Sequence, residues 1–156
     1  MHMGFNLGQD LFIKGLKNPE TAVNGTIHLP ASGSMIDVSG MARFSFLVQA
    51  GALAHDVTLQ VKQATSVSEA AIKNVTDATL VFDATDNPQE WGVIEVDVDR
   101  LDINNDFRYV SLAVSGGSTN DYMSAMFLSY GEGTRPVTQT TGSANYGFYD
   151  QAIVAG

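Results

Sequence analysis

Apolar and polar residues alternate along most of the central part of the chain, with the period of two that a half-buried β-strand requires. The clearest example is the segment 57–62, in which three apolar residues alternate with three polar ones. The same alternation predicts strands at 42–49, 78–84, 93–99, 107–114 and 123–130. The segment 23–29 is a weaker candidate. Pro30 after it indicates a sheet edge or a strand end, because proline cannot donate to a ladder.

The alternation also predicts which side chains of each strand face the core. Leu47 is the apolar residue that breaks the pattern, because it lies on the otherwise polar face of 42–49. The sets expected to face the core are Phe44, Phe46 and Val48; Val57, Leu59 and Val61; Leu80 and Phe82; Ile94, Val96 and Val98; Val110, Leu112 and Val114; and Met126, Leu128 and Tyr130.

Turn-forming residues separate these segments, and no amphipathic helix of ten or more residues lies between them. The helix-like stretch 68–73 is too short to stand alone, so we expect a loop with at most one helical turn. This pattern predicts an all-β fold, an antiparallel β-sandwich or jelly roll. We expect one domain with its core at 37–133, an N-terminal arm or edge segment at 1–36 and a C-terminal arm at 134–156, because the periodicity fades in both flanks.

Composition narrows the classes of partner. The chain has 156 residues, which suits one domain, and 44% of them are hydrophobic, enough for a core. Acidic residues number 17 against 8 Lys and Arg, and a net charge of −9 repels phosphate backbones, so we expect no nucleic acid partner. No export signal and no apolar segment of about 20 residues is present, so we expect no membrane partner. The chain has no cysteine, which excludes disulfides and thiolate chemistry.

Carboxylates are concentrated between residues 83 and 106, where Arg100 is the only base. A single strand at 93–99 would place three of them on one face, about 6 to 7 Å apart. Such a face is either solvated, keeping the protein soluble and blocking edge pairing, or it binds a divalent cation that relieves the repulsion. We favour the solvated face and expect no metal. A cation site would be built from Glu95, Asp97, Asp99, Asp102, Asn104 and Asp106.

The segment 102–106 resembles the start of a calcium-binding loop, with oxygen ligands at positions 1, 3 and 5. Phe107 stands where such a loop needs glycine, and Ala113 stands where it needs a bidentate glutamate. An EF-hand is therefore excluded, and a turn between two strands explains the same residues.

The sequence contains no recognisable catalytic motif. His2, His28 and His55 are scattered, and neither a His-Glu-x-x-His motif nor a Gly-x-Ser-x-Gly elbow occurs. We therefore predict that the protein is not an enzyme and has no cofactor.

Aromatic residues allow two interpretations. Trp91, Tyr122, Tyr146 and Tyr149 are candidates for stacking on a carbohydrate, a common design in β-sandwiches. The alternative, which we favour, is that Trp91 caps the core at the start of its strand and that the tyrosines belong to a subunit interface.

Four runs of the chain resemble small structural proteins encoded among the head genes of tailed bacteriophages. They are VTLQVKQAT at 57–65, AIKNVTDA at 71–78, IEVDVDRLD at 94–102 and FRYV at 107–110. The resemblance covers roughly residues 40 to 115. It implies a capsid decoration or cement protein, with a β-sandwich or jelly-roll fold that is often trimeric and sits on the outside of the shell. The expected partners are the major capsid protein and further copies of the chain. The expected location is the virion, with the host cytoplasm during assembly.

Both flanks lie outside the region of resemblance, and extended termini can add to an exposed sheet edge of a neighbour. We therefore hypothesise that they contact the capsid or an adjacent copy. The residues proposed for this contact are Phe5, Leu11, Phe12, Tyr146, Phe148 and Tyr149. The alternative function is a carbohydrate- or receptor-binding module of a phage tail or cell surface.

Overall fold

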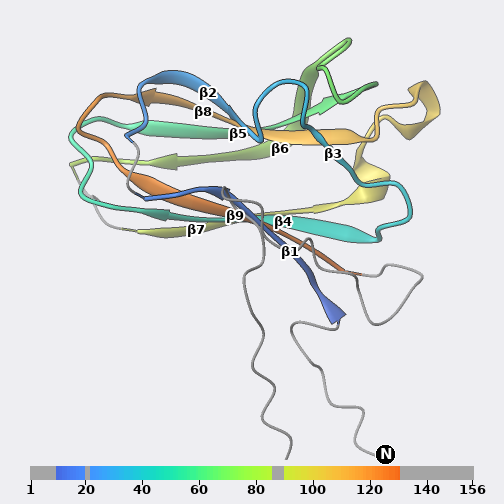
Figure 1. The fold of residues 1–156 in the computed structure, drawn as a ribbon, viewed down its shortest axis with the longest axis horizontal. Helices are drawn as coiled ribbons and strands as arrows, with labels where there is room; N and C mark the ends of the chain where they lie inside the picture. The colour runs from blue at the N-terminus through green and yellow to red at the C-terminus, as the bar shows by residue number, and fades with distance from the viewer. Residues whose placement is uncertain (1–9, 20–21, 86–89, 131–156) are drawn as a thin grey trace, which may run out of the picture.

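The computed structural model describes residues 10–19, 22–85 and 90–130, and these form two antiparallel sheets packed face to face (Figure 1). One sheet has the order β1 (Phe12–Lys17), β9 (Met123–Tyr130), β4 (Arg43–Ala50), β7 (Trp91–Asp97). The other has the order β2 (Gly25–Leu29), β8 (Tyr109–Gly117), β5 (Val57–Ala64), β6 (Lys73–Phe82), and β3 (Ile36–Asp37) also pairs with β8. The short 3-10 helices η1 (Val98–Arg100) and η2 (Ile103–Asn105) lie between β7 and β8. The predicted all-β sandwich is confirmed.

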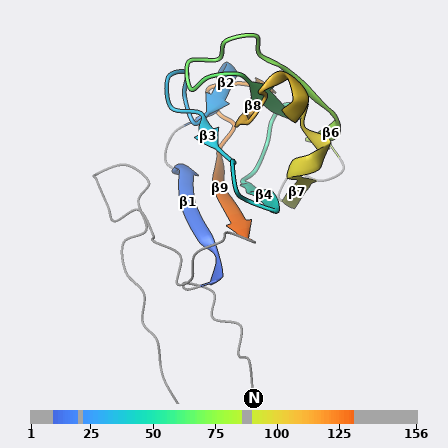
Figure 2. The same ribbon diagram turned by 90° about the vertical axis from the view of Figure 1, so that its right-hand side faces the viewer.

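The topology is that of a jelly roll. The chain passes back and forth between the sheets, so that β1, β4, β7 and β9 lie in one layer and β2, β5, β6 and β8 in the other (Figure 2). The orders β1-β9-β4-β7 and β2-β8-β5-β6 match the two four-stranded sheets of an eight-stranded jelly roll, and β3 is a short additional strand that pairs with β8. In this arrangement the first and last described strands are neighbours in the same sheet.

The core lies between the sheets and is built mainly from the predicted inward residues. Phe44, Phe46 and Phe127 are fully buried, with ring centroids 5.4 to 5.9 Å apart. The inward residues of β5 and β8 are likewise buried. Alternation therefore identified the buried face correctly wherever only one face of a strand is apolar.

The prediction for 123–130 selected the wrong face. Met123, Ala125 and Phe127 are buried, whereas Met126, Leu128 and Tyr130 point outward. The reason is the pairing with β4, which sets Phe127 opposite the inward Phe46, and residues directly opposite share a face of the sheet.

Several strand boundaries also differ from prediction. β7 starts at Trp91 and ends at Asp97, so Asp99 lies on η1 and not on the strand. The pairing with β4 ends there because β4 begins at Arg43. The amide of Val98 still donates to the carbonyl of Ala42, the residue just before β4. β6 starts earlier than predicted and β8 starts later. The stretch 68–73 is a loop, as expected, and positive φ angles at Glu69 and Ala71 are incompatible with a right-handed helix.

The described part of the segment 1–36 supplies edge strands to both sheets. β1 pairs with β9, and β2 pairs with β8 as the predicted weak strand before Pro30. Leu16 and Val23 are buried in the core. The expected C-terminal arm at 134–156 lies outside the described residues.

Gly116 in β8 provides a stability test. Its φ is +96°, and a Cβ there would overlap the backbone carbonyl oxygen of Asp56. Gly116→Ala is therefore expected to lower the free energy of unfolding by about 2 kcal/mol, from backbone strain together with the clash. Gly33→Ala is the matched control, because Gly33 has a φ of +83° with open space around it, and its cost should be about 1 kcal/mol. Equal losses in urea denaturation would show that the clash contributes nothing.

Candidate functional site

An apolar patch crosses all four strands on the outward surface of the four-stranded sheet, beside polar side chains such as those of Arg43, Glu95 and Gln49. Val93 on β7, Leu47 on β4 and Met126 on β9 lie in one row, and Leu128 on β9 lies opposite Ile13 on β1. Val93 is 57% exposed and Met126 is 38% exposed. We call these five residues the apolar face. β4 and β9 thus carry apolar side chains on both faces, a pattern typical of strands covered on both sides.

The outward surface of the other sheet is mostly polar. Its outward residues on β5 are Thr58, Gln60 and Lys62, and their partners on β6 and β8 include threonine, asparagine and serine. Val81 on the edge strand β6 is an exposed apolar exception, at 53%. One outer surface of the sandwich therefore carries an apolar patch among polar side chains, and the opposite surface is mostly polar.

Glu95 and Asp97 of the acidic stretch are neutralised from the neighbouring strand. Arg43 lies opposite Asp97 in the β4–β7 pair, and its Nη1 is 3.1 Å from Oε1 of Glu95 while its Nε donates to Asp97. Tyr130 Oη donates to Oε2 of Glu95 at 2.5 Å. Hydrogen bonding to Asp97 raises the pKa of the Arg43 guanidinium above its ordinary value. The repulsion that the sequence suggested is thus relieved by a cation of the chain itself.

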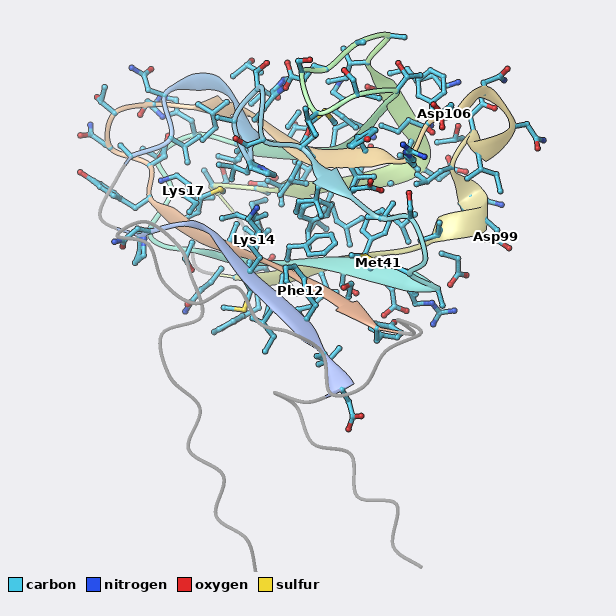
Figure 3. All side chains as sticks on the ribbon, turned by 45° about the vertical axis from the view of Figure 1, so that its right-hand side comes forward. Phe12, Lys14, Lys17, Met41, Asp99 and Asp106 are labelled. Carbon is cyan, nitrogen blue, oxygen red and sulfur yellow. The ribbon has the colours of Figure 1, made fainter. Side chains whose placement is uncertain are left out.

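The remaining acidic candidates do not join Glu95 and Asp97. Asp102 is paired with Lys73 and also accepts from Nδ2 of Asn105 at 2.8 Å, and these contacts hold the pKa of Asp102 below its usual range. Oδ1 of Asp106 is 3.6 Å from Nη1 of Arg108. Asn104 is exposed. Figure 3 shows Asp99 and Asp106 well separated. In the ranges that the structure describes, no group of three or more acidic or histidine side chains could hold a metal ion.

The histidines form separate structural contacts. His28 on β2 is 2.5 Å from Glu69, which ties the loop after β5 to that strand. His55 is 3.1 Å from Asp121, not paired with its neighbour Asp56. His2 lies outside the described residues.

Asp121 is a fully buried carboxylate that the sequence analysis did not single out. Its Oδ1 accepts from the amide of Ala54 at 2.5 Å, and its Oδ2 accepts from the amide of Ser118 at 2.7 Å and from Nδ1 of His55. Burial by itself raises the pKa of Asp121, but these hydrogen bonds outweigh it and hold that pKa below its usual value. Asp121 therefore fastens two loops at one end of the sandwich. The sequence does not reveal this role, since Ala54 and His55 lie more than 60 residues from Asp121 and only Ser118 is near it in the chain.

Two exposed aromatic residues lie at that same end, on the outward side of the four-stranded sheet. Trp91 is 65% exposed, so the interpretation that it caps the core is wrong. Tyr122 is 43% exposed. Adjoining hollows of about 370 and 200 Å³ share the floor Gln49 to Gly51, with Trp91 beside the first and Tyr122 beside the second. The structure thus brings together two of the four aromatic residues proposed for sugar stacking. Tyr146 and Tyr149 lie outside the described residues.

Among the residues proposed for capsid contact, the structure describes Leu11 and Phe12. Phe12 points inward from β1 (labelled in Figure 3), with its ring 6.4 Å from that of Phe127 and edge-on to it. Leu11 is partly buried. Phe5, Tyr146, Phe148 and Tyr149 lie outside the described residues. The described ranges contain no helix with the length and apolarity of a membrane span.

The fold and these surfaces define a jelly-roll β-sandwich with an apolar patch on one outer surface and a mostly polar opposite surface. Comparison of the chain with protein-family models, with curated proteins and with solved structures found no match.

Proposed function

We propose that the chain is a structural, non-enzymatic protein of a virion, which decorates and stabilises the outer surface of a tailed-phage capsid. The observation that carries the proposal is the contrast between the two outer faces of the sandwich. A decoration protein needs one surface that is buried against a partner and an opposite surface that remains in water. The apolar face suits the first requirement, and the outward side chains of β5 suit the second.

The jelly roll is compatible with this role, because viral capsid proteins are among the proteins that use it. The fold alone does not select a function, since lectins and cupins share it. The resemblance of residues 40 to 115 to phage head proteins adds the expectation of a shell partner.

The proposed partners are the major capsid protein and further copies of the chain, assembled as a trimer. Contacts repeated on a symmetric lattice act together, so one copy need not bind tightly by itself. In this proposal the terminal segments that contain Phe5 to Leu11 and Tyr146 to Tyr149 add further contacts with the shell or with an adjacent copy. The protein would then reside in the virion, and in the host cytoplasm during assembly.

The test is a pair of matched variants assayed by cosedimentation with empty shells of the major capsid protein encoded in the same genome. Val93→Asp places a charge in the apolar face and is expected to weaken binding at least about tenfold, because the carboxylate would lose water at the contact. Val81→Asp is the control, since Val81 is 53% exposed on an edge strand of the opposite sheet and Val93 is 57% exposed. It should bind as the parent does.

Equal binding by the two variants and the parent would contradict the role of the apolar face. Absence of binding by the parent chain, in the trimeric form or any other, would contradict the capsid function itself. Circular dichroism of each variant confirms that neither substitution has disturbed the sheets.

A further inference from the structure

The two adjoining hollows beside Trp91 and Tyr122 form a groove with Gln49 to Gly51 as its floor. The capsid proposal gives this groove no role. Trp91 lies opposite Gln49 across the β4–β7 pair, and Gln49 lies opposite Ser124 across the β4–β9 pair. Tyr122 is two residues before Ser124 and therefore has the same outward direction. The Cα atoms of Trp91 and Tyr122 are about 12 Å apart, because they are offset by two strand spacings across the sheet and by two residues along the strand.

Backbone hydrogen bonds hold the two aromatic residues on either side of this floor. The amide of Gly51 donates to the carbonyl of Tyr122 at 2.8 Å, and the amide of Ala50 donates to the carbonyl of Glu90 at 2.8 Å, next to Trp91. Both rings are thus carried by segments fixed to the same strand. Asp121, immediately before Tyr122, is buried and triply hydrogen-bonded, which anchors that side of the groove.

The side chains along the groove suit an uncharged ligand with many hydroxyl groups. The carboxamide of Gln49 offers both donors and acceptors, and Glu90 and Ser124 line the adjoining hollows. Among the residues that the structure describes, no Lys, Arg or His lines either hollow, and these residues therefore offer no cation to a phosphate or an acidic sugar. Two exposed aromatic faces separated by polar groups are the arrangement on which the apolar faces of sugar rings stack.

We infer that this groove is a carbohydrate-binding site, and that its ligand is an uncharged oligosaccharide that spans the distance from Trp91 to Tyr122. Two sugars of the oligosaccharide stack on the two rings, and Gln49 hydrogen-bonds the hydroxyl groups between them. This site adjoins the apolar face but uses other residues, since Val93 follows Trp91 by two residues on β7 and Met126 follows Ser124 by two residues on β9.

Trp91 is the only tryptophan of the chain, so its fluorescence reports on the site directly. The probes are chitopentaose, cellopentaose and maltopentaose, with a galacturonic acid oligomer as the charged comparison. At least one uncharged probe is expected to change the emission saturably, with a Kd between about 0.1 and 1 mM, and the charged oligomer is expected to bind more weakly.

Variants of Tyr122 separate stacking from a general effect on the fold. Tyr122→Ala should raise the Kd at least about tenfold while Trp91 still reports, and Tyr122→Phe should restore binding because it keeps the ring. Val93→Ser is the matched control on the apolar face and should leave the Kd unchanged. The absence of a saturable change with every uncharged probe at about 10 mM, or an unchanged Kd in Tyr122→Ala, would overturn the inference.

The inference and the capsid proposal can fail separately. Val93→Asp tests shell binding and leaves both stacking rings in place, whereas Tyr122→Ala tests sugar binding and leaves the apolar face in place. Shell binding without a sugar response would contradict only the site described above.

Discussion

Phe127→Ala is expected to cause the largest loss of stability, about 3–5 kcal/mol in the free energy of unfolding. Phe127 is fully buried, and its ring centroid is 5.7 Å from that of Phe44 and 5.4 Å from that of Phe46. The substitution removes apolar burial and leaves a cavity in the core between the two sheets, which β4 and β9 cannot fill without breaking their ladder. For a domain of this size, such a loss is a large fraction of the total stability.

Urea denaturation followed by circular dichroism measures this effect, and the slope with denaturant should stay close to that of the parent. Phe12→Ala is the control, because Phe12 lies on the edge strand β1, is only partly buried and meets Phe127 edge-on. Its loss should be clearly smaller. Similar losses for both variants would mean that the ring cluster around Phe127 is not the centre of the core.

Asp121→Asn is expected to lower the free energy of unfolding by about 3 kcal/mol near pH 7. The carboxylate is buried and accepts three hydrogen bonds, from Ala54, Ser118 and His55. An amide presents one acceptor oxygen where the carboxylate presents two, so at least one of these donors would lose its partner without gaining water.

The effect of Asp121 should depend on pH in a defined direction. Its pKa in the folded state is below the ordinary value for aspartate of about 3.9. The charged carboxylate therefore stabilises the fold fully above about pH 4, and this contribution is lost as the pH falls through the lowered pKa. The difference in stability between the parent and Asp121→Asn should shrink in acid.

Urea denaturation at pH values between about 7 and 3 measures this difference. Asp56→Asn serves as the control, because the exposed Asp56 carboxylate accepts one backbone hydrogen bond, from Ala84 at 3.0 Å, and its loss should be small. A difference between the parent and Asp121→Asn that stayed constant over this pH range would show that the charge of Asp121 does not contribute.

The alternation of residues was sufficient to predict the sandwich and most of its buried faces. In β5 the apolar residues Val57, Leu59 and Val61 share one face, and the residues between them are polar. Burial of the apolar face therefore determines the orientation of the strand. In β9 both faces are apolar, so the period of two is preserved in either orientation. The choice is made by β4, which places Phe127 opposite Phe46.

The candidate sites were less accessible to sequence reasoning. Trp91 and Tyr122 were named as candidates for sugar stacking, but their position on either side of Gln49 to Gly51 follows from the order of three strands. The acidic stretch was recognised, whereas its counter-ion Arg43 lies 54 residues before Asp97. The apolar face likewise joins residues from four strands, of which only Leu47 was noticed as an exception to its pattern.

The sequence by itself determined the fold class, the approximate positions of the strands and the acidic charge, because these depend on neighbouring residues and on composition. The tertiary structure decided the jelly-roll order, the buried face of β9, the pairing of Arg43 with the acidic strand and the contacts of Asp121. Each of these joins segments far apart in the chain. Their contact depends on how the whole chain closes into two sheets, and no local period carries that information.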